Sequence, residues 1–144
     1  MKPLILMMLL SLSDLAGAGS AAELFIRHQA EHLTDYSAQE QESHLRLLTA
    51  EHPAQATLHF RLGNLLARQQ RWPEARLAYQ TALEKHSGHP DLHHNLAIAL
   101  DHLEQLPTAI HHYRAALQAS ESRQHRFQRA AVLKRLRQIE ATQP

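Results

Sequence analysis

Apolar residues recur with helical spacing along most of the chain. Leu58, Leu62, Leu65 and Leu66 stand at i, i+4, i+7 and i+8, which places them on one face of a helix. This spacing predicts an amphipathic helix over about residues 54–69.

Breaks between apolar segments divide the middle of the chain into further helices. Trp72-Pro73 follows the first helix, and proline is tolerated at the start of a helix because that residue's N–H needs no intrahelical partner. Gly88 can adopt the left-handed conformation that ends a helix, and Pro90 can open the next one. We therefore expect three more helices, over about residues 73–85, 90–103 and 107–119.

The flanking segments also have helical patterns. Ser37-Ala38-Gln39-Glu40 has the spacing of a capping box, and it precedes a segment that carries Leu45, Leu47 and Leu48 and ends before Pro53. Apolar residues also predict a helix over residues 23–33 and a long one over 123–140. The predicted parts of the chain are a targeting segment (1–22), an N-terminal helix pair that is a degenerate repeat or cap (23–53), two repeated units (54–120) and a basic capping helix (121–144).

The middle of the chain repeats itself with a period of about 34 residues. The matching pairs are Leu58/Leu92, Leu62/Leu96, Gly63/Ala97, Trp72/Leu106, Pro73/Pro107, Ala75/Ala109, Tyr79/Tyr113, Ala82/Ala116 and Leu83/Leu117. Because the matches cover two successive helices, the repeated unit is a helix pair. The pair Gly63/Ala97 has a small residue in both repeats, which indicates a close approach of two helices at this position.

The repeat resembles that of tetratricopeptide repeat (TPR) proteins, whose 34-residue helix-turn-helix unit has Leu-Gly early, an aromatic residue near the inter-helix turn, then Ala, Tyr and Ala-Leu. Leu62-Gly63, Trp72, Ala75, Tyr79 and Ala82-Leu83 stand at these places. The second unit departs at Ala97 and Leu106. The resemblance covers about residues 54–120 and implies an all-α fold: a short, right-handed α-solenoid of antiparallel helix pairs with flanking capping helices. Two units need such caps to bury their apolar faces.

The resemblance also implies a concave wall, built by the first helix of each unit, that binds an extended or helical peptide. By position in the repeat, this partner-binding groove would contain Phe60, Arg61, Asn64, Arg68, His94, Asn95, Ile98, Asp101, His102, Gln128 and Arg129, together with His125 and Arg135. Some family members hold a C-terminal carboxylate on this wall with two Asn and several basic residues. Asn64, Asn95 and Arg129 match that clamp, whereas Phe60 and His125 stand where lysines are expected. General groove contacts are the alternative.

Composition narrows the possible functions. The chain has only four Gly, which disfavours a turn-rich β fold, and no Cys, which excludes disulfides, zinc-thiolate sites and thiol catalysis. Its formal net charge of +1 gives no general case for binding nucleic acid. We find no nucleophile–base set, paired carboxylates or phosphate loop, so we expect no enzymatic activity and no cofactor.

The thirteen histidines raise an alternative function, metal binding on the same scaffold. His89 and His93 have i, i+4 spacing, which can place two imidazoles on one side of a helix, and His86 is nearby. A strong site needs a third ligand, and Asp91 is expected to point elsewhere. The competing interpretation is that these histidines are solvated helix residues.

The segment over residues 1–22 has the pattern of a secretory signal peptide. Met1-Lys2 precedes an apolar run over residues 4–10, and Ala16-Gly17-Ala18 offers a cleavage site. The alternative is an uncleaved membrane anchor, although the apolar run is short and Asp14 follows it. We therefore expect an exported protein, most simply periplasmic, or one anchored in the inner membrane and facing the periplasm.

Charge is unevenly distributed between the two ends. Residues 23–55 have a net charge of −4 and residues 120–144 a net charge of +4, which permits head-to-tail association of copies. The function hypothesis is an adaptor that binds a peptide or helix of a partner protein, in the assembly of an envelope apparatus for secretion, pili or cytochrome maturation. The apparatus is named by analogy only.

Overall fold

In the computed structural model, the residues described are Ile26, His28 and 37–142. The chain divides into one unit at residues 1–36 and another at 37–144. In the first unit only Ile26 and His28 are described, and both are helical. The predicted signal peptide and nearly all of the predicted helix over 23–33 thus lie outside the described residues. None of the helices within the described ranges is long and apolar enough to cross a membrane.

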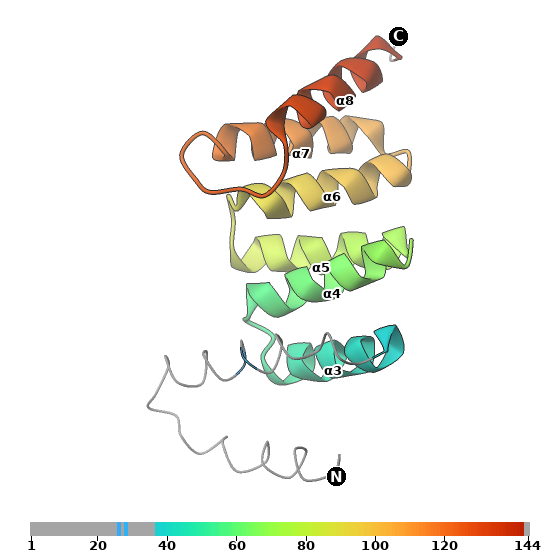
Figure 1. Ribbon diagram of the computed structural model, residues 1–144, viewed down its shortest axis with the longest axis vertical. Coiled ribbons are helices and arrows are strands. Elements are labelled where there is room, and N and C mark those ends of the chain that lie inside the picture. The colour runs from blue at the N-terminus through green and yellow to red at the C-terminus, as the bar shows by residue number, and fades with distance from the viewer. Residues whose placement is uncertain (1–25, 27, 29–36, 143–144) are drawn as a thin grey trace. The chain divides into compact units, whose positions relative to one another are not determined.

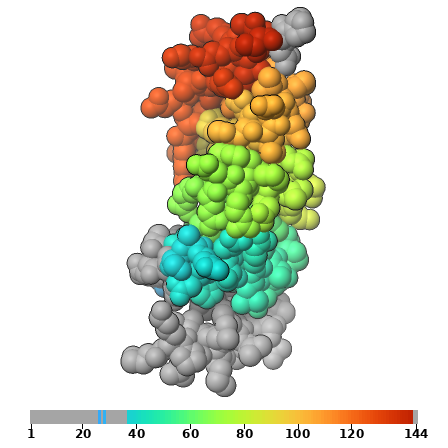
Figure 2. Space-filling view, turned by 90° about the vertical axis from the view of Figure 1, so that its right-hand side faces the viewer, coloured from blue at the N-terminus to red at the C-terminus, as the bar shows by residue number. Residues whose placement is uncertain are grey.

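The second unit consists of helices joined by short turns and one longer linker. Their bounds are α3 Ala38–Glu51, α4 Ala56–Arg68, α5 Trp72–Lys85, α6 Pro90–His102, α7 Leu106–Ala119 and α8 Arg129–Ala141. Each helix packs against the next one in the chain, and α4 also contacts α6. Figure 1 shows these helices as a stack, and in Figure 2 the colours from α3 to α8 follow one another along it. The predicted all-α architecture of helix pairs is confirmed.

The core of the helix pairs α4–α5 and α6–α7 is formed by the residues that match between the two 34-residue repeats. A Cβ atom added at Gly63 would lie 2.5 Å from Cε1 of Tyr79, so the ring of α5 rests directly on the backbone of α4. Tyr79 is 2% exposed, and Ala97, the counterpart of Gly63, is fully buried. The predicted close approach at this position is therefore correct.

The backbone of the turns also repeats. Gln70 and Glu104, which occupy the same place in the two successive units, both have positive φ angles, of 60° and 57°. The following N–H groups, of Arg71 and Gln105, donate to the carbonyls of Leu66 and Leu100 at 3.0 and 2.9 Å, which closes the end of the helix in both units. Sequence reasoning missed these left-handed residues, because glycine occupies neither position. Gly88 does have the predicted left-handed conformation, with φ of 76°.

Helix α3 is attached to the repeats through apolar and charged contacts. Ser37 and Glu40 form the predicted capping box. Leu45 and Leu48 are buried, whereas Leu47 is 41% exposed. Arg71, at the start of α5, donates to Glu42 of α3 at 2.5 Å, and this hydrogen bond is the main reason why the pKa of Glu42 is lowered.

The last helix is shorter than predicted, because α8 begins at Arg129 and not near Arg123. Residues 121–128 form a linker that descends past the start of α6 before α8 begins (Figure 1). Within it, Phe127 stacks on His94 with ring centroids 4.5 Å apart, and the Arg126 N–H donates to Asp91 at 2.8 Å. These contacts hold the linker against α6. Ala131, which follows Ala97 by one further repeat length of 34 residues, is exposed, whereas Ala97 is fully buried.

Candidate functional site

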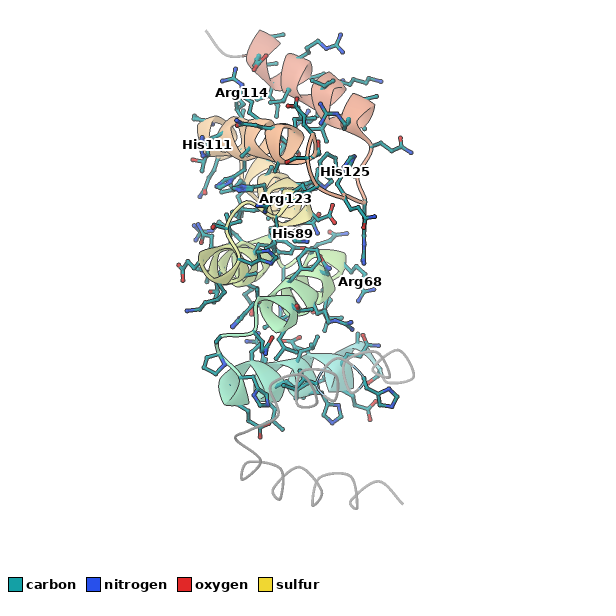
Figure 3. The ribbon with its side chains drawn as sticks, turned by 90° about the vertical axis from the view of Figure 1, so that its left-hand side faces the viewer. Arg68, His89, His111, Arg114, Arg123 and His125 are labelled. Atoms are coloured by element: carbon teal, nitrogen blue, oxygen red, sulfur yellow. The ribbon has the colours of Figure 1, made fainter. Side chains whose placement is uncertain are left out.

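A hollow of about 1180 Å³ lies beside the N-terminal half of α4, between the α5–α6 turn and the 121–128 linker. Three stretches of the chain form it: residues 56–64 of α4, residues 86–92 around the start of α6, and residues 121–126 of the linker. In Figure 3, Arg123 and His125 of the linker lie on the same side of the stack as His89. This hollow is the candidate binding site.

Phe60 provides an aromatic surface in the hollow. Its ring lies 6.0 Å from that of Tyr79 and 6.3 Å from that of His89. His89 precedes α6 and is also in edge contact with His86, at 5.3 Å between ring centroids. Burial is the main reason why the pKa of His89 is lowered. Two imidazoles and one phenyl ring therefore form an aromatic patch.

The linker is held in place by contacts with the second helix pair. Arg123 donates through Nη1 to the carbonyl of Gly88 at 2.7 Å. His125 contacts Phe127, which stacks on His94. Burial is also the main reason why the pKa of His94 is lowered. The linker wall of the hollow is thus fixed by groups that lie far from it in the sequence, at and just before α6.

Asn64 connects the two repeated units. Its Oδ1 accepts from the Tyr79 hydroxyl at 2.9 Å and from Nδ2 of Asn95 at 2.8 Å. Burial raises the pKa of Tyr79 to about 12, so the hydroxyl keeps its proton and donates at neutral pH. The Asn64 amide nitrogen has no hydrogen bond to any described residue, and it can therefore donate to a bound chain.

Only part of the predicted groove lines the hollow. Phe60, Arg61, Asn64 and His125 do, and Asn95 lies next to Asn64 through the hydrogen bond between them. The other predicted residues are placed as follows: His94 lies under Phe127, Ile98 is half-buried, Arg68 is exposed at the end of α4, His102 stacks on Trp72, and Gln128 precedes α8.

Asp101 and Arg129 do not line the hollow, and both have structural partners. Arg135 of α8 donates to both carboxylate oxygens of Asp101 at 2.7 Å, which is the main reason why the pKa of Asp101 is lowered. Arg129 donates to the Leu117 carbonyl at 2.7 Å and to Ser120. Because Arg129 is bound at the end of α7, it does not complete a carboxylate clamp with Asn64 and Asn95.

The alternative metal site at His86, His89 and His93 is not assembled. His89 precedes α6 and contacts His86, whereas His93 points to α7, where its Nδ1 lies 3.0 Å from Nδ1 of His112. The i, i+4 argument therefore failed because His89 lies outside the helix. In the described part of the chain, no group of three or more His, Asp or Glu residues is placed to hold a metal ion.

Sequence reasoning missed several residues of the hollow. Arg123 and Arg126 were assigned to a basic helix, and His86 and His89 were considered only as metal ligands. Asp91 is buried beneath the linker, with its Oδ1 accepting from the Arg126 N–H. The one signal that could have pointed to the linker is the short interruption of apolar spacing between residues 120 and 126.

Comparisons with known proteins place these features in context. A family model described as tetratricopeptide repeat matches residues 43–90 and 60–123, and no curated protein matches the chain. Among solved structures, the first TPR of Spaghetti (RPAP3) bound to HSP90 peptide SRMEEVD has a TM-score of 0.71 and 14% identity, covering 83% of this chain and 93% of that one. The TPR2B domain of yeast Sti1 in complex with pHsp70 has a TM-score of 0.62 and 15% identity, covering 81% and 90%. At these identities the likeness shows the fold.

Proposed function

Because the chain belongs to the tetratricopeptide repeat family, we propose that it is a non-catalytic adaptor that binds a segment of a partner protein in the hollow beside α4. The observation that carries this proposal is the open hollow, in which Phe60 offers an apolar surface and Asn64 an unused amide donor. Similar folds hold peptides, as the HSP90 peptide on the first TPR of Spaghetti illustrates. An extended chain needs both kinds of contact, for its side chains and for its backbone.

Site-specific photo-crosslinking in cells tests this proposal. A photoreactive residue is placed at Phe60 in the hollow and, as the matched control, at Leu77, which is 56% exposed on α5. We expect one partner to crosslink at Phe60 and not at Leu77, and mass spectrometry then identifies the crosslinked segment.

The identified segment is then measured as a synthetic peptide by fluorescence anisotropy. Phe60→Ala is expected to weaken binding roughly tenfold or more, because an aromatic contact at the centre of an interface contributes on the order of 1–2 kcal/mol. Leu77→Ala should leave the affinity unchanged. Crosslinking at Leu77 alone, or equal affinity of both variants and the parent chain, would remove the hollow as the binding site.

We also propose that the adaptor acts after export, in the assembly of an envelope apparatus. The support is the signal-like pattern of residues 1–22. Fractionation of cells and the mass of the mature protein test this point. A mature chain that begins near residue 19 in the periplasmic fraction is expected, an intact chain in the membrane fraction would support the anchored alternative, and an intact cytoplasmic chain would contradict export.

A further inference from the structure

The acidic and basic side chains that line the hollow differ in the partners that they have within the chain. Asp91 is 7% exposed, and its Oδ1 accepts from the Arg126 N–H within the first turn of α6, where a negative charge is favoured. Glu121 faces Arg129, at 3.7 Å. Both carboxylates that line the hollow therefore already have a partner.

The two linker arginines do not have carboxylate partners. Arg123 donates to a neutral carbonyl, that of Gly88. Within residues 37–142, the Arg126 guanidinium forms no hydrogen bond or ion pair, and the contact of Arg126 with Asp91 uses the backbone N–H. The linker thus presents two guanidinium groups, neither of which forms an ion pair with a residue in the described part of the chain.

An apolar surface lies opposite these charges. Phe60 and Ala56 of α4 line the hollow together with Leu92, which is 3% exposed. A bound segment that satisfies both sides has to combine an apolar side chain with neighbouring carboxylates. A purely apolar segment would leave the arginines unpaired, and a basic segment would be repelled by them.

A chain terminus is the less suitable ligand. A C-terminal carboxylate held by two Asn and a basic residue needs all three at one place, but Arg129 is bound to the Leu117 carbonyl and Ser120. The Oδ1 atom of Asn64 is also already shared by Tyr79 and Asn95. The linker arginines, Arg123 and Arg126, can instead contact side chains along an extended segment.

We propose that the hollow binds an internal acidic segment of a partner protein, whose carboxylates pair with Arg123 and Arg126 while an apolar residue packs on Phe60. This inference rests on the proposed function and specifies its partner. It makes the linker, which lies outside the two repeated units, the element that selects the ligand.

Synthetic peptides test the proposal on the full chain by fluorescence anisotropy. The acidic probe has leucine flanked by glutamates and an amidated C-terminus, and two companions of the same length carry glutamine or lysine in place of glutamate. We expect the acidic probe to bind roughly tenfold or more tightly than the glutamine probe, because hydrogen bonds between charged groups are stronger than neutral ones. Added NaCl should weaken this binding by screening the charges. The lysine probe should not bind.

Substitutions in the protein test whether the preference for the acidic probe depends on the linker arginines. Arg126→Gln keeps the backbone N–H that holds Asp91, so the fold should be retained. It should lower the affinity for the acidic probe severalfold and leave the affinity for the glutamine probe unchanged. Arg137→Gln is the matched control, because Arg137 is exposed on α8 and, among the described residues, its side chain hydrogen-bonds only a carbonyl of its own helix. An equal loss with Arg137→Gln would overturn the proposal, since it would show general attraction to a basic protein.

A change at the C-terminus of the peptide distinguishes recognition of an internal segment from recognition of a chain terminus. The acidic probe with a free C-terminal carboxylate should bind as tightly as the amidated one. Tenfold tighter binding of the free acid would show that a terminus is recognised, and binding of the lysine probe, or none by the acidic probe, would also refute the proposal. Crosslinking of a partner at Phe60 remains an independent test of the adaptor function, whatever the charge of the segment.

Discussion

Replacing Gly63 by alanine tests the packing on which the fold and the hollow depend. The new methyl group would lie 2.5 Å from Cε1 and 2.6 Å from Cδ1 of Tyr79, whereas carbon atoms in contact are normally ~3.5–4.0 Å apart. The ring cannot easily move, because it is 2% exposed and its hydroxyl is bound to Asn64. The second unit differs: Ala97 is accommodated there, and the Tyr113 hydroxyl donates to Asp101 instead.

The magnitude follows from two opposing terms. Overpacking a well-filled core costs about 1–3 kcal/mol, and alanine gains about 1 kcal/mol over glycine within a helix. Gly63→Ala should therefore lower the free energy of unfolding by about 1 kcal/mol. In a Tyr79→Leu background the clash is removed, so the same substitution should raise the free energy of unfolding by up to about 1 kcal/mol.

Urea unfolding followed by circular dichroism, on all four variants of this cycle, measures the free energies. The sign reversal between the two backgrounds is the decisive result, because a general change in helix stability would have the same sign in both. If Gly63→Ala stabilises the protein in the presence of Tyr79, the close approach of α4 and α5 is not as described. The reasoning about the adjacent Asn64 would then also fail.

Two further predictions concern the stability of the second helix pair. Asp101→Asn should lower the free energy of unfolding by about 1–3 kcal/mol, because it weakens the pair of hydrogen bonds from Arg135. Urea unfolding measures this change, with Arg137→Gln as the control. Equal free energies of unfolding for the two variants would contradict the prediction. Burial, with His93 and His111, lowers the pKa of His112 from 6.5 to about 4. As the pH falls, the unfolded chain therefore takes up a proton at a higher pH than the folded chain does. The free energy of unfolding should fall as the pH drops from 6.5 towards 4, by roughly 1–2 kcal/mol, because partial exposure of the ring to solvent reduces the full effect. His112→Gln should reduce this slope, and an unchanged slope would exclude His112 as its cause.

Most of the fold could be predicted because its determinants are local or repeated. The spacing of Leu58, Leu62 and Leu66 determines the buried face of α4, and the Ser37–Glu40 capping box determines where α3 begins. The regular offset between matching residues then indicates that successive pairs pack alike. Each of these signals needs only neighbouring residues or a simple comparison of the chain with itself.

The linker could not be predicted because distant residues determine its conformation. A helix from residue 123 is locally acceptable, but the structure instead places Phe127 on His94 and the Arg126 N–H on Asp91. Both of these partners belong to α6, which is separated from the linker by the whole of α7. Tertiary contacts therefore override local helix propensity here, and the change moves Arg129 from the predicted groove to the end of α7.

The positions that repeat and the positions that line the hollow are nearly separate sets. Leu62, Ala75 and Tyr79 have identical counterparts in the second unit and are buried. In contrast, the hollow has Phe60 and Asn64, whose counterparts are His94 and Ile98. Since packing requires equivalent residues in each unit, whereas recognition requires a particular set at one place, ligand selectivity should depend on the non-equivalent positions and on the linker. Exchanging residues 60 and 64 for their counterparts should therefore alter binding far more than it alters the helical content.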